Sequence, residues 1–415
     1  MSSSEVAVVG GGAVGASVAY ELSRAGASVA LFEERSDVGE GCSWGSAGLI
    51  APSHAAPLAT PRAILEGIAQ TVRPAGSFSF IPRREVVPWL GRFVRAALTP
   101  GAVAAATHVM SELCGQGLEL HGEWHRRGIE SGFRPSGVLY VQRTARRARQ
   151  ARSRAERQRA TGLDVTTLGA DEARRFEPAL RSPAGAVFYP GDAMCDAPAF
   201  VKCVVAAARA HGATVRLSSH VRSLAPSPAG VSVQLEGETH VTKHVVVASG
   251  TGSVELLMRL GCALPVAAGR GFAVELEPRE RDPVVPIFIE EDRVLATPLR
   301  GRLRVSGVLV IGSRDTRADT PRALALSAAL GRSVRDISDA RVLRRWTGLR
   351  PMSPDGLPII GSLPREPSVL VATGHGMMGM TLAPVTAVLL RRGLEGGEAP
   401  AAAVSPSRFG VSRSR

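Results

Sequence analysis

VVGGGAVG, residues 8–15, is the stretch that decides the fold. The apolar run before it, 5–9, predicts a buried parallel strand, and a helical pattern follows over 13–25. The helix is expected to stop at Gly26, since glycine favours helix ends, and a second strand over 28–32 then leads into Glu33. This order of strand, glycine turn, helix and strand is typical of a dinucleotide-binding βαβ unit.

Each residue type in this unit has a physical task. Gly10 permits the tight turn, Gly12 lets the backbone approach a phosphate, and Gly15 lets the helix pack close to the strand. The helix N-terminus offers free N–H groups and a positive dipole to a pyrophosphate. Glu33 stands where a carboxylate accepts hydrogen bonds from a ribose. The sequence therefore predicts a bound dinucleotide.

Composition and charge limit the classes of protein to which this chain can belong. A chain of 415 residues, 45% of them hydrophobic, can bury a large core and is expected to form about two to three domains. Its apolar runs are interrupted by glycine, proline or charge, so we expect no transmembrane helix. The N-terminus lacks the basic and apolar segments of a signal peptide, which favours a cytoplasmic location. The five cysteines include no C-x-x-C pair, so neither a disulfide framework nor a metal site is indicated.

The net charge of +13 raises the question of an anionic partner. Only two of the 50 basic residues are lysines, a skew that is typical of a GC-rich coding bias rather than of a binding face. The densest basic run, 143–159, predicts a solvated helix face. The alternative is a basic helix at the inner face of a membrane, so a peripheral membrane contact stays open, whereas nucleic acid is not favoured.

The segment after the second strand indicates which dinucleotide binds. GCSWGSAGLIAP, 41–52, is a loop of small residues, and a long irregular segment rich in proline follows it instead of further βα units. Such a loop can lie along an isoalloxazine ring and donate backbone N–H groups to it, which favours a flavin. Ser43 and Ser46 either bond phosphate or flavin oxygens or serve the turns alone.

These residues, together with two strings near the C-terminus, resemble the amino-acid oxidase family of FAD-dependent oxidoreductases. The C-terminal strings are WTGLRPMSPDGLPIIG, 346–361, and TGHGMMGMTLAP, 373–384. Within the family the chain is most similar to bacterial D-amino acid dehydrogenases, and the LAP after the GHG loop resembles glycine oxidases. The similarity extends from end to end and implies an FAD enzyme that oxidises amino acids.

The fold that this resemblance implies is α/β. It combines a Rossmann-like FAD-binding domain of the glutathione reductase type with an α+β substrate domain built on an antiparallel sheet. The FAD-binding domain would take 1–60, 165–255 and 345–415, and the substrate domain 61–164 and 256–344. Local patterns agree with the central piece, since Asp196 is expected to cap a helix over 197–211.

The resemblance also implies FAD contacts along the whole chain, with Val221 at the adenine and Ser249 and Gly250 near the pyrophosphate. The flavin is expected to bind non-covalently, because Gly348 and Gly45 stand where some relatives carry an attaching residue. No metal is expected. The full set of expected FAD contacts is Gly10, Gly12, Ala13, Val14, Gly15, Glu33, Glu34, Ser43, Ser46, Ala47, Gly48, Val221, Ser249, Gly250, Gly376, Met378, Gly379, Met380 and Thr381.

Three side chains are candidates for contact with the substrate. Arg350 matches the carboxylate-binding arginine of glycine oxidases, because a guanidinium fork binds a carboxylate bidentately; the alternative is a structural ion pair. His375 either touches flavin or substrate or only braces its loop, ahead of a helix expected over 382–391. His54 either binds substrate and accepts a proton or merely packs. His54 and His375 are the candidate catalytic residues, although an amino acid can lose its amine proton to water and needs no dedicated base.

The expected reaction is oxidation of a D-amino acid by hydride transfer from Cα to flavin N5. It gives an imino acid, then a 2-oxo acid and ammonia, and the electrons pass to oxygen or a quinone. Val294 and Leu295 replace the tyrosine that glycine oxidases place in this segment, which favours an apolar substrate side chain over glycine. The alternatives are a secondary amine of sarcosine or proline type and, less favoured, a modified tRNA base.

Overall fold

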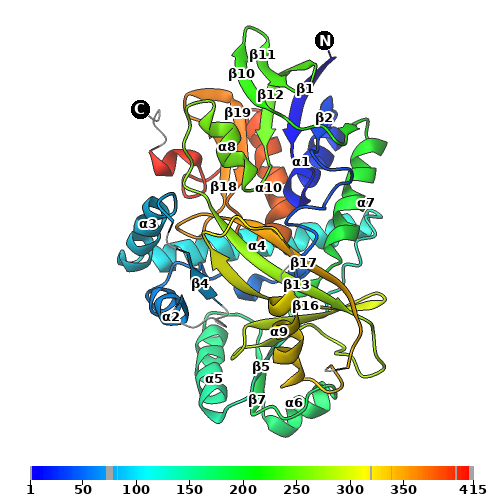
Figure 1. Cartoon of the computed structure of the whole chain (residues 1–415), viewed down its shortest axis with the longest axis vertical. Coiled ribbons are helices and arrows are strands. Elements are labelled where there is room, and N and C mark those ends of the chain that lie inside the picture. The colour runs from blue at the N-terminus through cyan, green and yellow to red at the C-terminus, as the bar shows by residue number, and fades with distance from the viewer. Residues whose placement is uncertain are drawn as a thin grey trace.

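The computed structural model describes residues 2–71, 78–81, 83–317, 320–337, 339–397 and 400–410. They form two large sheets with helices around them, and a small sheet of β3 (Leu49–Ile50) and β8 (Ala193–Met194) (Figure 1). The first sheet has a parallel centre, in which β1 pairs with both β2 and β12. Its strands, in spatial order, are β10 (Ser223–Ser227), β11 (Gly230–Gln234), β12 (Thr239–Val247), β1 (Ser2–Val9), β2 (Val29–Phe32) and β9 (Thr214–Arg216), with β19 (Glu366–Thr373) beside β12 and β18 (Ile359–Leu363) beside β19.

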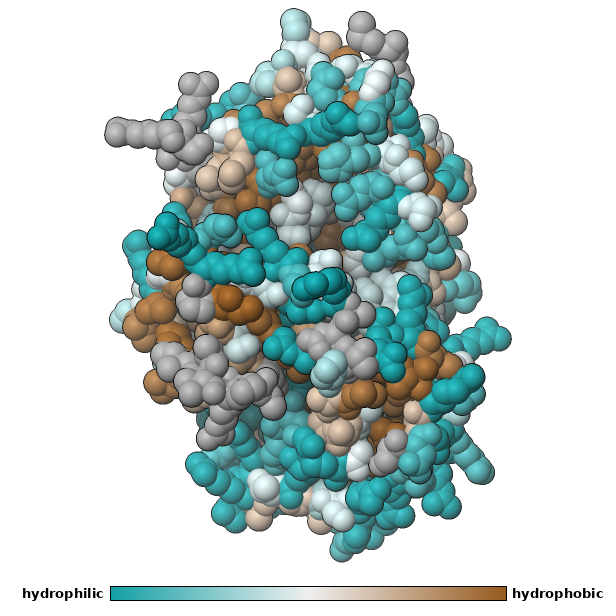
Figure 2. Space-filling model, in the orientation of Figure 1, coloured by the Kyte–Doolittle hydropathy of each residue, from teal (hydrophilic) through white to brown (hydrophobic). Residues whose placement is uncertain are grey.

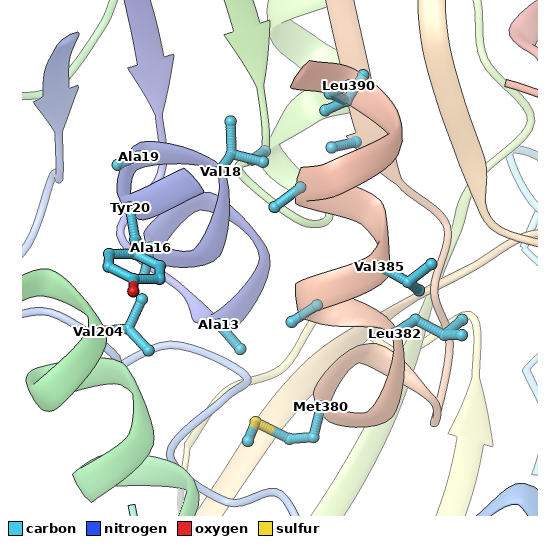
Figure 3. Packing of buried hydrophobic residues seen from close by; sticks show 14 of the residues in the cluster. Ala13, Ala16, Val18, Ala19, Tyr20, Val204, Met380, Leu382, Val385 and Leu390 are labelled. Carbon is cyan, nitrogen blue, oxygen red and sulfur yellow. The ribbon is translucent and has the colours of Figure 1, made fainter. Parts of the chain in front are cut away.

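Three helices pack together against this parallel sheet. They are α1 (Ala13–Arg24), α7 (Ala197–Ala210) and α10 (Gly379–Leu394). In Figure 3, α1 lies between α7 and α10, and Tyr20 of α1 is directed toward Val204 of α7. Small buried side chains such as Ala16 allow this close approach. The expected βαβ unit is therefore present, and Gly26, with a φ of +93°, follows α1 as expected.

The second sheet is mostly antiparallel and has nine strands. Their spatial order is β17 (Val342–Met352), β13 (Ala267–Leu276), β16 (Arg302–Ile311), β15 (Val294–Leu299), β14 (Ile287–Ile289), β5 (Val138–Gln142), β7 (Gly185–Tyr189) and β6 (Thr166–Leu168), with β4 (Phe78–Phe80) beside β16. This agrees with the expected fold class. Strands β6 and β7 lie within 165–255 and most of β17 lies within 345–415, two ranges expected to belong to the FAD-binding domain. All three strands belong to the second sheet, so the chain passes between the two sheets more often than the expected domain boundaries imply.

Of the remaining helices, α8 (Gly252–Met258) packs against β10 of the first sheet, and most of the others lie around the second sheet (Figure 1). The longest, α4 (Ala102–Arg126), packs against α10 and α3, and the others are α2 (Pro61–Thr71), α3 (Val87–Leu98), α5 (Ala145–Ala160), α6 (Ala170–Phe176) and α9 (Thr320–Gly331). Over the described ranges, no helix is both long and apolar enough to span a membrane.

Two local expectations are wrong, each for a physical reason. The proline-containing segment is not irregular throughout, because Pro61 and Pro88 stand in the first turns of α2 and α3, where the missing N–H is tolerated. Asp196 does occupy the N-cap position of α7, yet its side chain makes no cap hydrogen bond. Its carboxylate instead pairs with Arg302 of the second sheet, with 2.6 Å between Oδ2 and Nη2.

Candidate active site

A cavity of about 1280 Å³, lined by residues of both sheets, extends from the glycine turn to β17. Gly10 has a φ of +108°, and a Cβ there would lie 2.8 Å from the Ala248 carbonyl oxygen. A Cβ on Gly15 would lie 1.9 Å from the Gly10 carbonyl oxygen, so only glycine lets α1 start this close to β1. Gly15 therefore serves packing and does not line the cavity.

Glu33 closes the turn from the end of β2. Its Oε2 accepts a 2.6 Å hydrogen bond from the Gly11 N–H, and only 8% of the residue is exposed. Glu34, the next residue, also lines the cavity and lies 3.3 Å from His220. Val221, Ser249 and Gly250 line the cavity as well. These groups surround a space of the kind that a ribose and pyrophosphate need, bounded by a carboxylate and a helix N-terminus.

The loop of small residues, 41–48, is held over the cavity from two sides. The Ser43 hydroxyl accepts a 2.9 Å hydrogen bond from the Ala13 N–H at the start of α1. From the second sheet, the Arg304 guanidinium donates to the Ser46 carbonyl at 2.8 Å, and the Thr297 hydroxyl donates to the Ala47 carbonyl at 2.8 Å. Gly48 does not line the cavity. Its role is steric, since a Cβ there would lie 2.2 Å from the Cys195 carbonyl oxygen.

Arg304 was not among the expected site residues, although it fixes this loop. Its side chain is fully buried and forms an ion pair with Glu275 at 2.6 Å. Burial lowers the pKa of Arg304, and Glu275 opposes that shift. Nothing in the sequence distinguishes this arginine from the other arginines of the chain, so only the fold identifies it.

The N-terminus of α10 faces the same cavity. This helix begins at Gly379, three residues before the expected start, so its first turn contains Met380 and Thr381. Gly376, Met378, Gly379, Met380 and Thr381 all line the cavity. A helix N-terminus there supplies positive potential to a group that gains negative charge.

His375 is turned toward the helix. Its Nε2 lies 3.0 Å from the Thr386 hydroxyl, and only 5% of the residue is exposed. Burial lowers the pKa of His375 to about 3, so the ring is neutral near pH 7. His375 also lines the cavity, while this contact holds its ring to α10.

Arg350 of β17 presents a half-buried cation to the cavity. Its guanidinium lies over Gly271 of β13, where a Cβ would fall 1.5 Å from Nη1. That Nη1 is buried and has no hydrogen-bond partner among the residues that the structure describes. Burial lowers the pKa of Arg350. Because a buried N–H group without a partner is costly, an anion bound at this guanidinium would be favourable.

His54, at the end of the short 3₁₀ helix Pro52–His54, borders another part of the cavity. Its imidazole is hydrogen-bonded to the Tyr140 hydroxyl, and the Phe288 ring stands 5.6 Å away, edge to face. Burial lowers the pKa of His54 to about 4, with a smaller contribution from Arg154. Next to it, the Ser53 hydroxyl donates to Asp192, whose pKa burial raises to about 6.

Tyr140 is a second residue that sequence reasoning missed. No tyrosine is present near 289–298, but strand β5 places Tyr140 at the cavity. Tyr140 follows His54 by 86 residues in the sequence and is hydrogen-bonded to it in the fold. Leu295 also lines the cavity, whereas Val294 is buried behind the wall. Further apolar surface comes from Met352, Phe288 and Leu309.

Most of the basic run 143–159 lies in α5, and the run is only partly solvated. Arg146 and Arg149 are exposed as expected. Arg154, by contrast, pairs with Glu290 and, like Arg147, lines the cavity mouth. Arg143 pairs with Asp292 at 3.0 Å.

The fold and this site define a flavin-dependent oxidoreductase. The family model described as DAO, FAD dependent oxidoreductase, matches residues 5–392, so the chain belongs to that family. The D-amino acid dehydrogenase of Methylobacterium radiotolerans is 30% identical over 91% of this chain and 92% of its own, and that of Cereibacter sphaeroides is 29% identical over 94% and 92%. The glycine oxidase of Geobacillus kaustophilus, a solved structure, is 26% identical with a TM-score of 0.79 over 98% of this chain and 99% of that one.

The protein is therefore an FAD-dependent enzyme that acts on amino acids. The cavity fits FAD on grounds of its own. The glycine turn leaves no room for a side chain at Gly10, and Glu33 stands at the end of β2. The N-termini of α1 and α10 both face the cavity.

Proposed function

We propose that this enzyme oxidises a D-amino acid with an apolar side chain and that it holds FAD non-covalently. The observation that carries the proposal is the buried Nη1 of Arg350, which lacks a partner in the described chain and borders the same cavity as the glycine turn. The name that curated relatives carry, D-amino acid dehydrogenase, supports the choice of substrate.

FAD, when bound, supplies the acceptor for the hydride that leaves the substrate Cα, and the protein supplies position and environment. Arg350 would bind the substrate carboxylate through its guanidinium fork and so restrict how Cα faces the cavity. Leu295, Met352 and Phe288 would exclude water and receive an apolar side chain. The set Gly10, Gly12, Ala13, Val14, Glu33, Glu34, Ser43, Ser46, Ala47, Val221, Ser249, Gly250, Gly376, Met378, Gly379, Met380 and Thr381 would hold the cofactor.

Neither candidate histidine is suited to act as a strong base. His375 is engaged with Thr386, and its pKa is lowered to about 3. His54 is engaged with Tyr140, and its pKa is lowered to about 4. We propose instead that the substrate amine loses its proton to water before it is oxidised, and that His54 and Tyr140 together shape the pocket.

The test is the visible spectrum of the purified protein without oxygen, before and after addition of single amino acids. Bleaching of a flavin band by D-valine or D-leucine, and not by the L-enantiomers, is the expected result. Bleaching only by N-methylated or cyclic amino acids would replace the proposal with oxidation of a secondary amine. Air or a soluble quinone is then added to the bleached enzyme. The electron acceptor is the one of the two that restores the flavin band.

Loss of the flavin band on unfolding and filtration tests the non-covalent attachment. The expected result is a yellow filtrate and a colourless protein. Flavin retained on the unfolded chain would contradict the attachment and would direct attention to Cys42, the thiol that lines the cavity.

A further inference from the structure

The outer face of α3 exposes a stripe of apolar side chains. Val87, Val94 and Leu98 recur with the period of one helix face and are 57%, 38% and 60% exposed, and Gly91 lies between them. We call these four residues the α3 stripe. Leu65, on the neighbouring helix α2, is 70% exposed. These two short helices carry four of the ten large apolar side chains that are exposed among the described residues, and Figure 2 shows hydrophobic side chains gathered over this part of the molecule.

The α3 stripe is not needed to hold α3 in the fold. The opposite face of the helix buries Trp89, Phe93 and Ala97, and the Trp89 indole N–H donates to the Met352 carbonyl at 2.9 Å. The helix is therefore apolar on both sides, whereas a helix that only covers a core has a polar outer face. Exposed apolar groups that cluster in this way mark a contact surface.

The charges around the α3 stripe are mostly positive. Exposed arginines stand within α3, at Arg92 and Arg95, and just before it, at Arg83 and Arg84. The helix itself contains no acidic residue. Glu85, the one acid in the residues leading into α3, is exposed and lies 3.9 Å from Arg314. A second copy of this chain would set arginine against arginine across a two-fold contact, whereas an anionic surface would neutralise them.

We propose that the α3 stripe, with its arginines, docks onto the surface of an anionic lipid bilayer. Val87, Val94 and Leu98 would enter the headgroup boundary, and Arg92 and Arg95 would meet the lipid phosphates, as in an interfacial helix. The basic helix α5 lacks half of this combination, since none of the exposed large apolar side chains lies on it. The membrane contact that its arginines suggest is therefore assigned to α3.

Docking in this way places the active site next to the lipid. Phe93, on the buried face of α3, lines the cavity that also contains Arg350. The cavity and the lipid surface would thus be separated by about the width of one helix, roughly 10 Å.

The experiment is flotation of the purified holoenzyme with vesicles. One vesicle population is phosphatidylcholine alone, and the other contains phosphatidylcholine and phosphatidylglycerol in equal parts. The enzyme is expected to float with the anionic vesicles only and to dissociate as the salt concentration rises. The double variant Val94→Asp/Leu98→Asp should bind at least about tenfold more weakly, because it removes apolar area and adds negative charge.

Three control variants make the result specific to the α3 stripe. Met258→Asp and Leu343→Asp replace exposed apolar residues of α8 and β17 and should leave flotation unchanged. Arg146→Gln/Arg149→Gln removes exposed charge from α5 and should also have little effect. The flavin spectrum and turnover of every variant confirm that it is folded, and because these readouts do not depend on lipid, they separate this proposal from the proposed substrate.

Three results would overturn the proposal. They are equal flotation with neutral and anionic vesicles, unchanged flotation of the Val94→Asp/Leu98→Asp variant, and loss of flotation in the α5 variant alone. A concentration-dependent dimer that the α3 substitutions dissociate, together with no flotation, would instead assign this face to self-association.

Discussion

At the scale of single residues, Arg350 carries the largest predicted effect on activity. The Nη1 atom of its guanidinium is buried and has no partner in the described part of the chain. If it binds the substrate carboxylate, Arg350→Met should lower kcat/KM by about a hundredfold or more, because a charge-assisted bidentate contact is lost. Steady-state kinetics with the best substrate found in the bleaching assay measures this effect.

The matched control for Arg350 is Arg345→Met. Arg345 belongs to the same strand, β17, but it is exposed and does not line the cavity. Its substitution should change kcat/KM by less than about twofold, as for a solvent-exposed charge. An Arg350→Met enzyme with unaltered kcat/KM, beside a normal flavin spectrum, would remove Arg350 from the substrate site.

His54 leads to a prediction about pH dependence. Its pKa is lowered to about 4, chiefly by burial, so the imidazole stays neutral from about pH 5 to 8. The profile of kcat/KM over that range should therefore contain no ionisation that belongs to His54. His54→Gln should change the height of the profile and leave its midpoints in place, and a midpoint near 6.5 that disappears in the variant would contradict this assignment.

At the scale of elements, the start of α1 depends on the absence of a side chain. A Cβ on Gly15 would lie 1.9 Å from the Gly10 carbonyl oxygen, so Gly15→Ala must displace the glycine turn. We expect the purified variant to contain at least about tenfold less flavin per chain and to melt at a lower temperature. The absorbance ratio of flavin to protein and a thermal melt measure both effects.

Gly115→Ala is the control for that substitution. Gly115 lies within α4, and a Cβ there meets nothing within 4 Å. Alanine should therefore leave the flavin content unchanged and stabilise the helix by about 0.5–1 kcal/mol. Equal flavin content in the Gly15→Ala and Gly115→Ala enzymes would show that the close approach at Gly15 does not matter for cofactor retention.

The elements also show how far the sequence could be interpreted. The unit over 2–32 was predictable because its signals are local, with a strand period, a glycine turn and a helix end within one stretch. The start of α10 was placed three residues late, since Gly379 and Met380 look like loop residues and become helical through packing. The place of Arg350 at the cavity could be predicted from a motif. The places of Tyr140 and Arg304 could not, because strand pairing between distant segments brings Tyr140 to the cavity and Arg304 to the Ser46 carbonyl of the loop that lines it.

At the scale of the whole molecule, an ion-pair network joins the second sheet to the loop 41–48 and to the start of α7. Glu275 accepts from both Arg302 and Arg304 at 2.6 Å, and Arg302 also pairs with Asp196 at the start of α7. Arg304 extends the network to the Ser46 carbonyl. The second sheet thus fixes the geometry of the loop over the FAD site, so the cofactor site is complete only when both sheets are folded together.

Buried histidines tie the stability of the whole fold to pH. His121 is 2% exposed and bonds the Met380 carbonyl, and burial lowers its pKa to about 4. His375 behaves in the same way, with a pKa of about 3. The unfolded chain binds protons at these histidines below about pH 6.5, whereas the folded chain does not, so stability is fully present above pH 6.5 and is lost as the pH falls toward 4.

Asp192 opposes this trend, because its pKa is raised to about 6 and the folded chain takes up its proton first. The histidines outnumber it, so the midpoint of thermal unfolding should fall by several degrees between pH 7 and pH 5. His121→Gln keeps an N–H donor for Met380 but does not titrate, and its melting temperature should fall less over the same interval. His108→Gln, at an exposed position on the same helix, should follow the unmodified enzyme. If His121→Gln and the unmodified enzyme lose equal stability between these two pH values, the buried histidines are not the cause of the pH dependence.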